Sequence, residues 1–331
     1  MRLLIISNNP DRASFRQRIG NYLDLLRDRG IECEVVRLPA GMLKRREVFA
    51  SARHFDGVLL HRKMLNAWDA FWLRRYCGKV IYDFDDAIMY SDRRPERISR
   101  ARFRRFGRPA GLSDLVIAGN DYLAEHARRY NRNVRVLPTG LDVGAYRAAG
   151  QRERGGSVRL VWIGSRSTLK YLSEIRPALE ELGRRFDHVR LRMICNEFFD
   201  LESMRVEKCA WSSQTEAADL VTSDIGLAPL PDNPFTRGKC GFKILQYHAA
   251  GLPVVASPVG VNAQYAREGV TGLLATTESE WVEKLSQLIE DAQLREQMGR
   301  EGLRTVGSFD VSVIGQEFSG LIASCLQSPT P

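Results

Sequence analysis

Three carboxylates follow a short apolar run in the first half of the chain. In the stretch VIYDFDDAI, Asp83, Asp85 and Asp86 come at the end of a run that predicts a β-strand over residues 79–82. Carboxylates this close repel one another when ionised, so a purely structural role would lower stability. They can bind a cation, hold an arginine, or act as a general base toward a hydroxyl group. The residue types alone leave these three roles open.

Arginines also follow predicted strand ends in this half, at Arg16, Arg18 and Arg62. A guanidinium there can clamp a phosphate or pair with the aspartates, because it donates two parallel hydrogen bonds to either group. An ordinary surface position is the alternative for each of them. Arg18 is the one for which we expect a structural role.

Two lysines four residues apart lie near the start of a helix predicted over residues 242–250. Lys239 and Lys243 occur in RGKCGFKILQYHAAGLPVV. On a helical turn, side chains at this spacing share one face. Cations at a helix N-terminus oppose the helix dipole unless an anion is bound. The pair therefore predicts a phosphate site, with a solvated basic face as the alternative.

A second basic turn comes earlier in this half, in WIGSRSTLKYL. A strand predicted over 158–163 ends at Gly164, and Arg166 and Lys170 lie in the turn that leads into a helix. A glycine there lets the backbone approach a phosphate, and the first turn of the helix supplies N–H groups. Such a turn also occurs without any ligand, so by itself it is a weak signal.

These residues depend on strands and helices to position them. Short β-branched runs alternate with helix-period segments along the whole chain, which is typical of parallel βαβ units. The predicted strands cover residues 3–7, 33–38, 57–60, 79–82, 115–118 and 134–137, then 158–163, 189–195, 225–230, 253–257 and 271–275. The Gly- and Arg-rich stretch 142–157 predicts a linker between them.

We therefore expect an α/β protein with two doubly wound, Rossmann-like domains, 1–150 and 151–331, facing across a cleft. The last helix is expected to pack back on the first domain. A chain of 331 residues suits two domains. Ligands of such sheets bind at the carboxyl ends of the strands.

The composition narrows the class of protein. The apolar run in MRLLIISNN is too short for a signal peptide, and no run reaches the roughly 20 apolar residues that span a bilayer. The six cysteines form no CxxC pair and have no histidine at zinc spacing, so we expect free thiols and no metal. These features predict a cytoplasmic protein.

Charge is distributed unevenly along the chain. Residues 1–150 hold 29 Lys and Arg against 17 Asp and Glu, a net of +12, whereas residues 151–331 hold 20 against 23, a net of −3. An anionic membrane, a phosphate-bearing acceptor or nucleic acid would each fit the basic half. We exclude nucleic acid as a partner, because few aromatics interleave and no recognisable RNA or DNA motif occurs.

Much of the positive charge lies between residues 91 and 109. Eight arginines occur there against two acidic residues, and they are Arg93, Arg94, Arg97, Arg100, Arg102, Arg104, Arg105 and Arg108. Ile98, Phe103 and Phe106 are interspersed, which predicts a helix lying on an anionic bilayer with these apolar side chains dipping inward. The protein would then be peripheral on the inner face of the cell membrane. A mobile solvated loop is the alternative.

The second half resembles a known family. AAGLPVVAS followed by GVTGLLA resembles the donor-binding stretch of the retaining glycosyltransferases of family 4, which have the GT-B fold. DIGLAPLPDNPFTRGKCGFK resembles a bacterial branch of that group, involved in envelope polysaccharide synthesis. The resemblance covers residues 158–307 well, whereas the first half contributes mainly VRVLPTGLD. It implies a hexosyltransferase that uses a nucleoside-diphosphate sugar, retains the anomeric configuration and needs no metal or cofactor.

The resemblance also implies which residues bind the donor. The family's pyrophosphate-binding lysine falls on Lys170, and its arginine falls on Ser165, with Arg166 next to it. Its two glutamates fall on Gly238 and Gln246. Gln246 can still bind ribose hydroxyls as a neutral amide, but Gly238 has no side chain with which to contact the sugar.

Two further positions match the nucleobase pocket of this branch, Trp211 and Glu216. Trp211 can stack on a base or belong to the core. His248 replaces an apolar helix residue, so we expect it to pack inside.

On the acceptor side, Asp85 and Asp86 stand near the place where the family often has a His-Asp pair. We therefore predict Asp85, Asp86, Lys170 and Lys239 as catalytic. The remaining predicted contacts are Gly164, Ser165, Arg166, Trp211, Glu216, Lys243 and Gln246 to the donor, and Arg16, Arg62 and Asp83 to the acceptor.

Other classes compete with this interpretation. D-x-D also marks haloacid-dehalogenase-type phosphatases and the metal site of the other glycosyltransferase fold, but neither has the AAGLPVV segment or this arrangement. Loss of both family glutamates favours a different alternative: a catalytically degenerate partner subunit that binds a nucleotide or glycan. The partners that we expect are a nucleotide sugar, a glycan or lipid-linked acceptor, and an anionic membrane surface.

Overall fold

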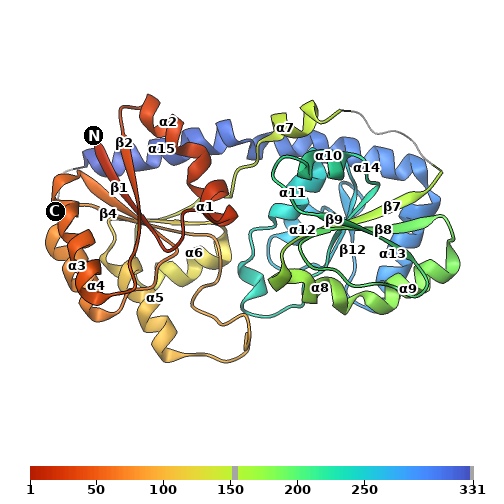
Figure 1. Ribbon diagram of the computed structural model, residues 1–331, viewed down its shortest axis with the longest axis horizontal. Helices are drawn as coiled ribbons and strands as arrows, with labels where there is room; N and C mark the ends of the chain where they lie inside the picture. Colours follow the sequence, from red (N-terminus) through yellow and green to blue (C-terminus); the bar gives the residue numbers. More distant parts are fainter. Residues whose placement is uncertain (151–155, 329–331) are drawn as a thin grey trace. The chain divides into compact units, whose positions relative to one another are not determined.

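The computed structural model describes residues 1–150 and 156–328, which form two compact units (Figure 1). The first unit comprises residues 1–140, 233–240 and the chain from Val311 onward, and the second comprises 141–232 and 241–310. The confirmed prediction is the fold class: each unit is built on a parallel six-stranded sheet with helices on both faces.

The chain first changes unit between Gly140 and Leu141, ahead of the predicted linker. Leu141 donates its N–H to the carbonyl of Phe309, and Asp142 caps helix α7 (Val143–Ala148) by accepting from the N–H of Ala145. Part of the linker is therefore a capped helix of the second unit. Residues 151–155 of the predicted linker lie outside the described residues.

The sheet of the first unit has the order β2-β1-β3-β4-β5-β6. Its strands are β1 (Arg2–Ser7), β2 (Glu32–Arg37), β3 (Gly57–His61), β4 (Val80–Phe84), β5 (Leu115–Ala118) and β6 (Val134–Val136). β3, β4 and β5 are buried throughout, which explains their continuous apolar runs, since strands covered on both faces need no alternation.

Among the described residues, seven α-helices cover the two faces of this sheet. They are α1 (Ala13–Arg18), α2 (Leu23–Asp28), α3 (Met42–Ser51), α4 (Ala67–Tyr76), α5 (Arg100–Leu112), α6 (Asp121–Arg128) and α15 (Val311–Gln327). α3 to α6 contribute Phe49, Leu73, Phe106 and Leu123 to the core on one face, and α1, α2 and α15 contribute Phe15, Leu26 and Phe318 to the other.

The helical segment between β1 and β2 is broken in two. Ile19 leaves the helical conformation, and a short 3₁₀ turn, Gly20–Tyr22, separates α1 from α2. This turn directs Tyr22 into the core, where its ring lies 5.1 Å from that of Phe318 on α15. The break is therefore a consequence of packing against a helix from the far end of the chain.

The sheet of the second unit has the order β12-β11-β10-β7-β8-β9. Its strands are β7 (Val158–Ile163), β8 (Val189–Cys195), β9 (Arg205–Ala210), β10 (Ile225–Ala228), β11 (Val254–Ala256) and β12 (Gly272–Leu274). Besides α7, its helices are α8 (Leu169–Glu174), α9 (Arg176–Arg185), α10 (Glu216–Val221), α11 (Phe242–Ala249), α12 (Asn262–Tyr265), α13 (Glu278–Glu290) and α14 (Ala292–Val306).

Two differences from the expected elements have physical causes. The helix expected after Gly164 is divided at Ile175, because Pro177 lacks the N–H that a helix interior requires. β9 was not predicted: its sequence RVEKCA is half charged and none of its residues is fully buried, as suits a strand at the edge of a sheet.

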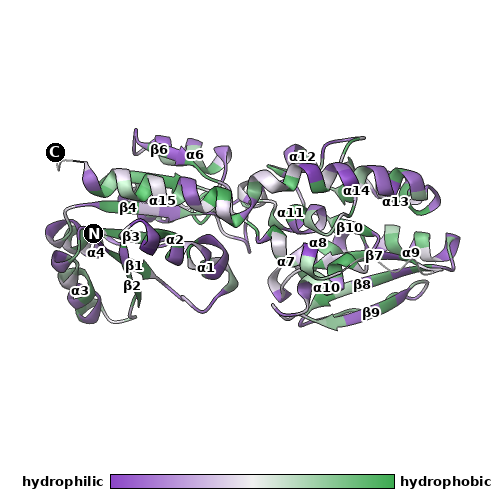
Figure 2. Cartoon of the chain, turned by 90° about the horizontal axis from the view of Figure 1, so that it is seen from above, coloured by the Kyte–Doolittle hydropathy of each residue, from purple (hydrophilic) through white to green (hydrophobic). Residues whose placement is uncertain are grey.

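Hydropathy follows these layers. Figure 2 shows green on the central strands and purple on the outer sides of many helices. Within the described residues, no helix combines the length and the apolar character needed to cross a membrane.

Candidate functional site

The carboxyl ends of β3 and β4 carry a buried charge cluster in the first unit. Asp83, on β4, is fully buried, and Arg18 of α1 is 1% exposed. Nη2 of Arg18 lies 2.9 Å from Oδ2 of Asp83, and its Nη1 donates to the carbonyls of Leu137 at 2.6 Å and Pro138 at 2.9 Å. Arg18 is thus structural, as expected.

Asp83 has no oxygen exposed to solvent, so we revise its predicted acceptor contact to a structural role. Burial raises the pKa of Asp83 to about 6, and the Arg18 guanidinium opposes this shift. The carboxylate is therefore ionised at neutral pH and holds Arg18 in place.

Arg62 links the next two carboxylates. It follows β3 in the left-handed conformation, with φ of 52°, and donates its backbone N–H to the carbonyl of Asp83 at 2.8 Å. This places Nε of Arg62 at 3.3 Å from Oδ1 of Asp85, while Nη2 contacts Asp86. Of the three roles open to the aspartates, holding cationic side chains is the one that the structure displays.

Lys239 completes this cluster, with its Nζ at 3.0 Å from Oδ1 of Asp86. Burial opposes ionisation of Asp86, but Lys239 and Arg62 together hold its pKa below the ordinary value. Two carboxylates thus face two cations. Across residues 1–150 and 156–328, no group of three or more His, Cys, Asp or Glu is arranged to hold a metal ion.

The segment 233–240 belongs to the first unit, although it lies within the second half of the sequence. The side-chain amide of Asn120 donates to the carbonyls of Gly238 at 3.3 Å and Lys239 at 3.2 Å, and the Tyr122 hydroxyl donates to that of Pro234 at 3.0 Å. Sγ of Cys240 donates to the carbonyl of Asp85 at 3.0 Å. These contacts attach segment 233–240 to the rest of the first unit, and the ion pair between Lys239 and Asp86 is one of them.

The prediction that Lys239 and Lys243 share a helical face is wrong. Lys239 is extended, and Gly241 adopts a left-handed conformation, with φ of 60°, immediately before α11 begins at Phe242. Lys243 lies in the second unit, where its Nζ stands 4.2 Å from the centre of the Trp162 ring. Lys239 thus lies before Gly241 and outside the helix, whereas Lys243 lies within its first turn.

Gly238 shows why a family glutamate is absent at this position. A Cβ added there would lie 2.6 Å from Cβ of Ala87 and 2.9 Å from a methyl group of Leu123. The segment packs too closely on the first unit to admit a side chain.

The turn after β7 carries several predicted donor contacts. A Cβ on Gly164 would lie 2.4 Å from the Trp162 ring, so the close approach of the strand requires glycine. Ser165 donates its N–H to Oγ1 of Thr168 at 3.1 Å, which closes the turn. Arg166 is largely exposed and its Nε lies 2.9 Å from Glu197.

Two hydrogen-bonded pairs lie further along the second unit. Trp211 donates its indole N–H to Oε2 of Glu216 at 2.7 Å, and both side chains are half-buried. Gln246 is 4% exposed, and its amide donates to the Tyr146 hydroxyl at 3.1 Å. The amide that replaces a family glutamate is therefore used in a contact with α7.

The remaining predicted residues are placed as follows. Lys170 is exposed on α8, with Nζ 5.0 Å from the centre of the Tyr171 ring. Arg16 is exposed on α1. His248 is buried, as expected, and burial lowers its pKa to about 4.

A cavity of about 440 Å³ opens at the carboxyl ends of β10 and β11 in the second unit. Its lining includes Pro229, Leu230 and Asp232 after β10, Ser257 after β11, and Glu174 of α8. The sequence interpretation missed these residues. The available signal was the pair of proline-containing loops, PLPD and SPVG, each directly following a strand.

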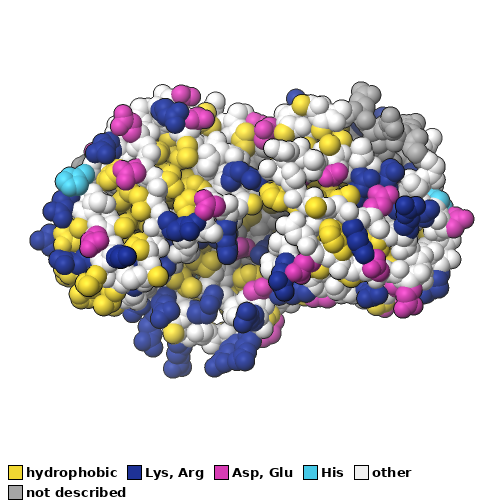
Figure 3. Space-filling view, in the orientation of Figure 1, with side chains coloured by type: hydrophobic (Ala, Val, Ile, Leu, Met, Phe, Trp, Pro, Cys, Tyr) yellow, Lys and Arg dark blue, Asp and Glu magenta, His cyan; other side chains and the backbone are white. Residues whose placement is uncertain are grey.

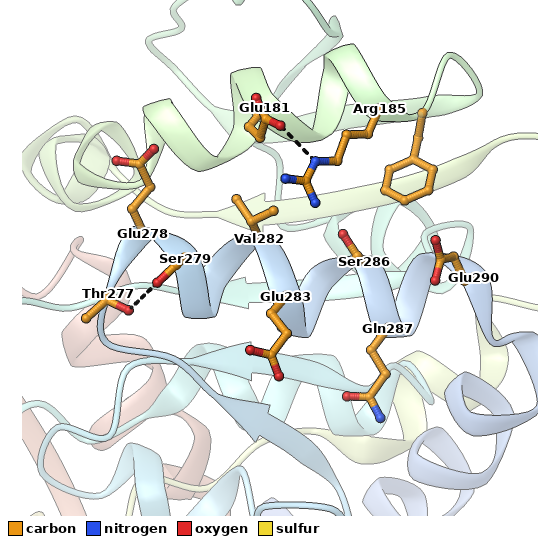
Figure 4. A pocket seen from close by; sticks show the side chains of 11 residues that line it. Glu181, Arg185, Thr277, Glu278, Ser279, Val282, Glu283, Ser286, Gln287 and Glu290 are labelled. Carbon is orange, nitrogen blue, oxygen red and sulfur yellow. Dashed lines mark hydrogen bonds and ion pairs between the residues drawn. The ribbon is translucent and has the colours of Figure 1, made fainter.

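A larger hollow lies elsewhere, between α9 and α13 (Figure 4). Glu181 and Arg185 reach into it from α9, and Glu283 and Glu290 lie along α13. None of the predicted site residues lines this groove.

The predicted orientation of α5 is wrong. Phe106 is fully buried, and Phe103 packs against the core of the first unit. Arg102 donates to the carbonyls of Ile88 and Tyr90, both at 2.6 Å, so this arginine also faces inward. The apolar side of α5 covers its own sheet and leaves no aromatic residue to enter a bilayer.

Comparison with known proteins places these features in a family context. Residues 147–291 match the family described as Glycosyl transferases group 1. The matched stretch covers much of the second unit and also includes segment 233–240 of the first. No curated protein sequence matches the chain.

Solved structures agree on the fold over nearly the whole chain. HepE of Anabaena, solved with UDP and glucose, aligns with a TM-score of 0.73 at 18% identity, over 98% of this chain and 100% of that one. Sucrose-phosphate synthase of Thermosynechococcus elongatus gives 0.75 at 14%, over 98% of each chain. WaaG, a glycosyltransferase involved in lipopolysaccharide biosynthesis, gives 0.68 at 14%, over 97% of this chain and 99% of that one. The GT-B fold is thereby confirmed.

Proposed function

We propose that the protein is a glycosyltransferase that moves a hexosyl group from a nucleoside-diphosphate sugar to a glycan or lipid-linked acceptor in bacterial cell-envelope polysaccharide synthesis. One observation carries the proposal. The stretch 147–291 that matches the glycosyltransferase family contains the Gly164 turn, the Trp211–Glu216 pair and the cations of the second unit.

The proposed chemistry follows from where these cations lie. Departure of a nucleoside diphosphate leaves negative charge on the phosphates, and cations already in place stabilise that charge in the transition state. Arg166 and Lys170 are exposed after β7, and Lys243 lies at the start of α11. We assign them to the diphosphate, and we assign Trp211 and Glu216 to the nucleoside. Transfer would retain the anomeric configuration and need no metal or cofactor.

We propose that the sugar binds in the 440 Å³ cavity of the second unit. Glu174, Asp232 and Ser257 line it, and such groups hydrogen-bond hydroxyls well. Burial raises the pKa of Glu174. UDP-glucose is the first donor to test, because HepE has been solved with UDP-glucose.

The acceptor-side proposal changes in one respect. Because Asp85 and Asp86 face Arg62 and Lys239, we assign these four groups a positioning role, in which they hold segment 233–240, instead of proton transfer. Arg16 remains a candidate for an acceptor phosphate, since it is exposed on α1, the helix that follows β1. We further propose that the enzyme works as a peripheral protein on the inner face of the cell membrane.

A second candidate is a partner subunit that binds nucleotide or glycan without turnover. It is favoured by the lack of room for a glutamate at Gly238 and by the engagement of Gln246 with Tyr146.

Calorimetric titration with UDP, UDP-glucose and the other nucleoside diphosphates tests both candidates. We expect one diphosphate to bind, its sugar to be hydrolysed slowly without acceptor, and EDTA to change neither result. Trp211→Ala should weaken binding, while Phe186→Leu, away from the cavity, serves as the control in the same unit. Binding without hydrolysis would favour the partner subunit, and no binding by any nucleotide would refute both.

A further inference from the structure

Exposed apolar side chains gather on one region of the first unit. Of the ten large hydrophobic side chains that are most exposed in the described residues, five lie on α3, on α4 or just before α5. They are Met42 at 49%, Leu43 at 68%, Trp68 at 40%, Phe71 at 59% and Ile98 at 72%. The second unit contributes only two to the ten. Large exposed aromatics next to aliphatics mark a surface that something covers.

The helices hold this group together in space. α3 and α4 run side by side, because Nε of Arg45 lies 3.0 Å from Asp69 and the Arg46 guanidinium lies 4.3 Å from the centre of the Trp72 ring. The start of α3, with Met42 and Leu43, therefore lies near the start of α4. Trp72 is edge-on to Trp68 and stacks on Tyr76, so an aromatic ladder runs along α4.

α5 joins the same region near the beginning of α4. The Leu65 N–H donates to the carbonyl of Arg105 at 3.0 Å, and Arg108 donates to the carbonyl of Leu65 at 3.4 Å. Figure 3 shows dark blue side chains next to yellow ones over the part of the first unit where Figure 1 labels α3, α4 and α5. We name this region the α3–α5 surface, defined by the five apolar residues above and by Lys44, Arg46, Arg97, Arg100, Arg104 and Arg105.

Positive charge is crowded on this surface. All six of its basic residues are exposed. Burial and the nearby Arg45 and Arg105 lower the pKa of Lys63, and only Asp69 opposes them. Cations this close to one another repel, which an anionic partner would relieve.

We propose that the α3–α5 surface seats the first unit on an anionic lipid bilayer, with Trp68, Phe71, Leu43 and Met42 entering the headgroup region and the arginines binding lipid phosphates. This deepens the proposed function, because it rests on the membrane location given there. A bilayer fits both halves of the surface: tryptophan and phenylalanine favour the interface, and arginine favours anionic headgroups. The apolar residues come from α3 and α4, whereas α5 supplies mainly charge.

Cosedimentation with vesicles of phosphatidylcholine alone or with 30% phosphatidylglycerol tests the proposal. The full chain should bind the anionic vesicles at least tenfold more tightly. Arg97→Gln/Arg100→Gln/Arg104→Gln should weaken that binding about 100-fold at low salt, given the contribution of each basic residue near such a surface. The matched control is Arg184→Gln/Arg300→Gln/Arg304→Gln in the second unit.

A second pair of variants separates insertion from charge attraction. Trp68→Ala/Phe71→Ala should weaken binding about tenfold or more and remove the part that survives high salt. Because Trp68 is the most exposed tryptophan of the chain, vesicle binding should shift the fluorescence to the blue, and Trp68→Phe should abolish the shift. Val270→Ala/Leu303→Ala is the control in the second unit.

Several outcomes would overturn the proposal. These are equal binding to neutral vesicles, no binding to either kind, or unchanged binding by Trp68→Ala/Phe71→Ala. Self-association without vesicles that the same double variant abolishes would make the surface an interface between two copies. Nucleotide binding is measured in parallel on every variant. Its absence in the unsubstituted protein would refute the proposed function while leaving vesicle binding as a separate result.

Discussion

The two units place charged residues at the same edge of the same kind of sheet, but in opposite ways. In the first unit, the carboxyl ends of β3 and β4 carry ion pairs with little or no exposure, Arg18–Asp83 and Arg62–Asp85. In the second, the turn after β7 exposes Arg166 and Lys170 to solvent. The same edge of a parallel sheet therefore does not imply the same chemistry, since burial decides whether a cation stabilises the fold or can bind a ligand.

Strand order reinforces this difference. In the second unit β7 is central, and the order reverses between β7 and β10, with the Gly164 turn at this point. In the first unit the reversal falls between β1 and β3, and α1 follows β1 there with Arg18 turned inward. Ligands of open α/β sheets bind at such reversals. In the first unit, Arg18 is instead held by Asp83 on β4 and by the carbonyls of Leu137 and Pro138, which follow β6.

Of the variants that test this comparison, the one that breaks the buried Arg18–Asp83 pair should have the largest effect on stability. Arg18→Met should cost the first unit about 3–5 kcal/mol, because it leaves the Asp83 carboxylate buried without a partner. Hydrogen exchange should then accelerate in β1, β3 and β4 and stay unchanged in β7 and β10. Arg27→Met, in a pair with Asp24 that is mostly exposed, is the control. A loss below about 1 kcal/mol would mean that the pair is not needed.

Next in size is the loss of an exposed cation from the second unit. Lys170→Ala should lower turnover roughly 10²–10³-fold, the effect typical of removing one group that stabilises transition-state charge. Lys239→Ala should leave nucleoside-diphosphate affinity within about twofold, because the ammonium group of this lysine is paired with Asp86. Equal loss of nucleotide affinity in both variants would contradict the assignment of Lys239. Lys284→Ala controls for charge in the second unit.

A smaller effect is expected on the pH dependence of stability, through His61. Burial, with Arg62 and Arg18, lowers the pKa of His61 to about 3, below its ordinary value of 6.5. The unfolded chain therefore binds a proton between these values while the folded chain does not, so stability is lost as pH falls from 6.5 toward 3. Between pH 6.5 and 5 the loss should be about 2 kcal/mol.

Urea unfolding of His61→Gln at several pH values measures this dependence. The free energy of unfolding of this variant should no longer fall by that amount between pH 6.5 and 5. His54→Gln, at an exposed histidine, should keep the pH dependence of the unsubstituted protein. An unchanged slope in His61→Gln would show that His61 is protonated in the folded state.

The smallest effect is expected from Arg166→Ala. Its pair with Glu197 is largely exposed, so the free energy of unfolding should change by less than about 0.5 kcal/mol. A drop in turnover without a drop in stability would support a donor contact for Arg166. No change in either would leave Lys170 and Lys243 as the cations of the donor site.

The amino-acid sequence by itself determined the two doubly wound sheets and the linear order of their strands. Strands buried on both faces must be continuously apolar, and their helices must show one apolar side, so both patterns are local and readable. Gly164 was readable for the same reason, because a strand running directly into a glycine and a helix is a local pattern.

Only the tertiary structure decided which charged residues meet. Arg18 and Asp83 are 65 residues apart, and Lys239 and Asp86 are 153 apart, so no spacing in the sequence reports either pair. Segment 233–240 lies in the second half of the sequence but packs in the first unit. The chain passes back to the second unit at Gly241, whose left-handed conformation precedes α11, so a helical pattern in the sequence does not reveal the change. For α5, periodicity revealed an apolar side but not what covers it. Burial of Phe106 against its own sheet, and exposure of Trp68 on the neighbouring helix, follow from packing between elements that no local pattern records.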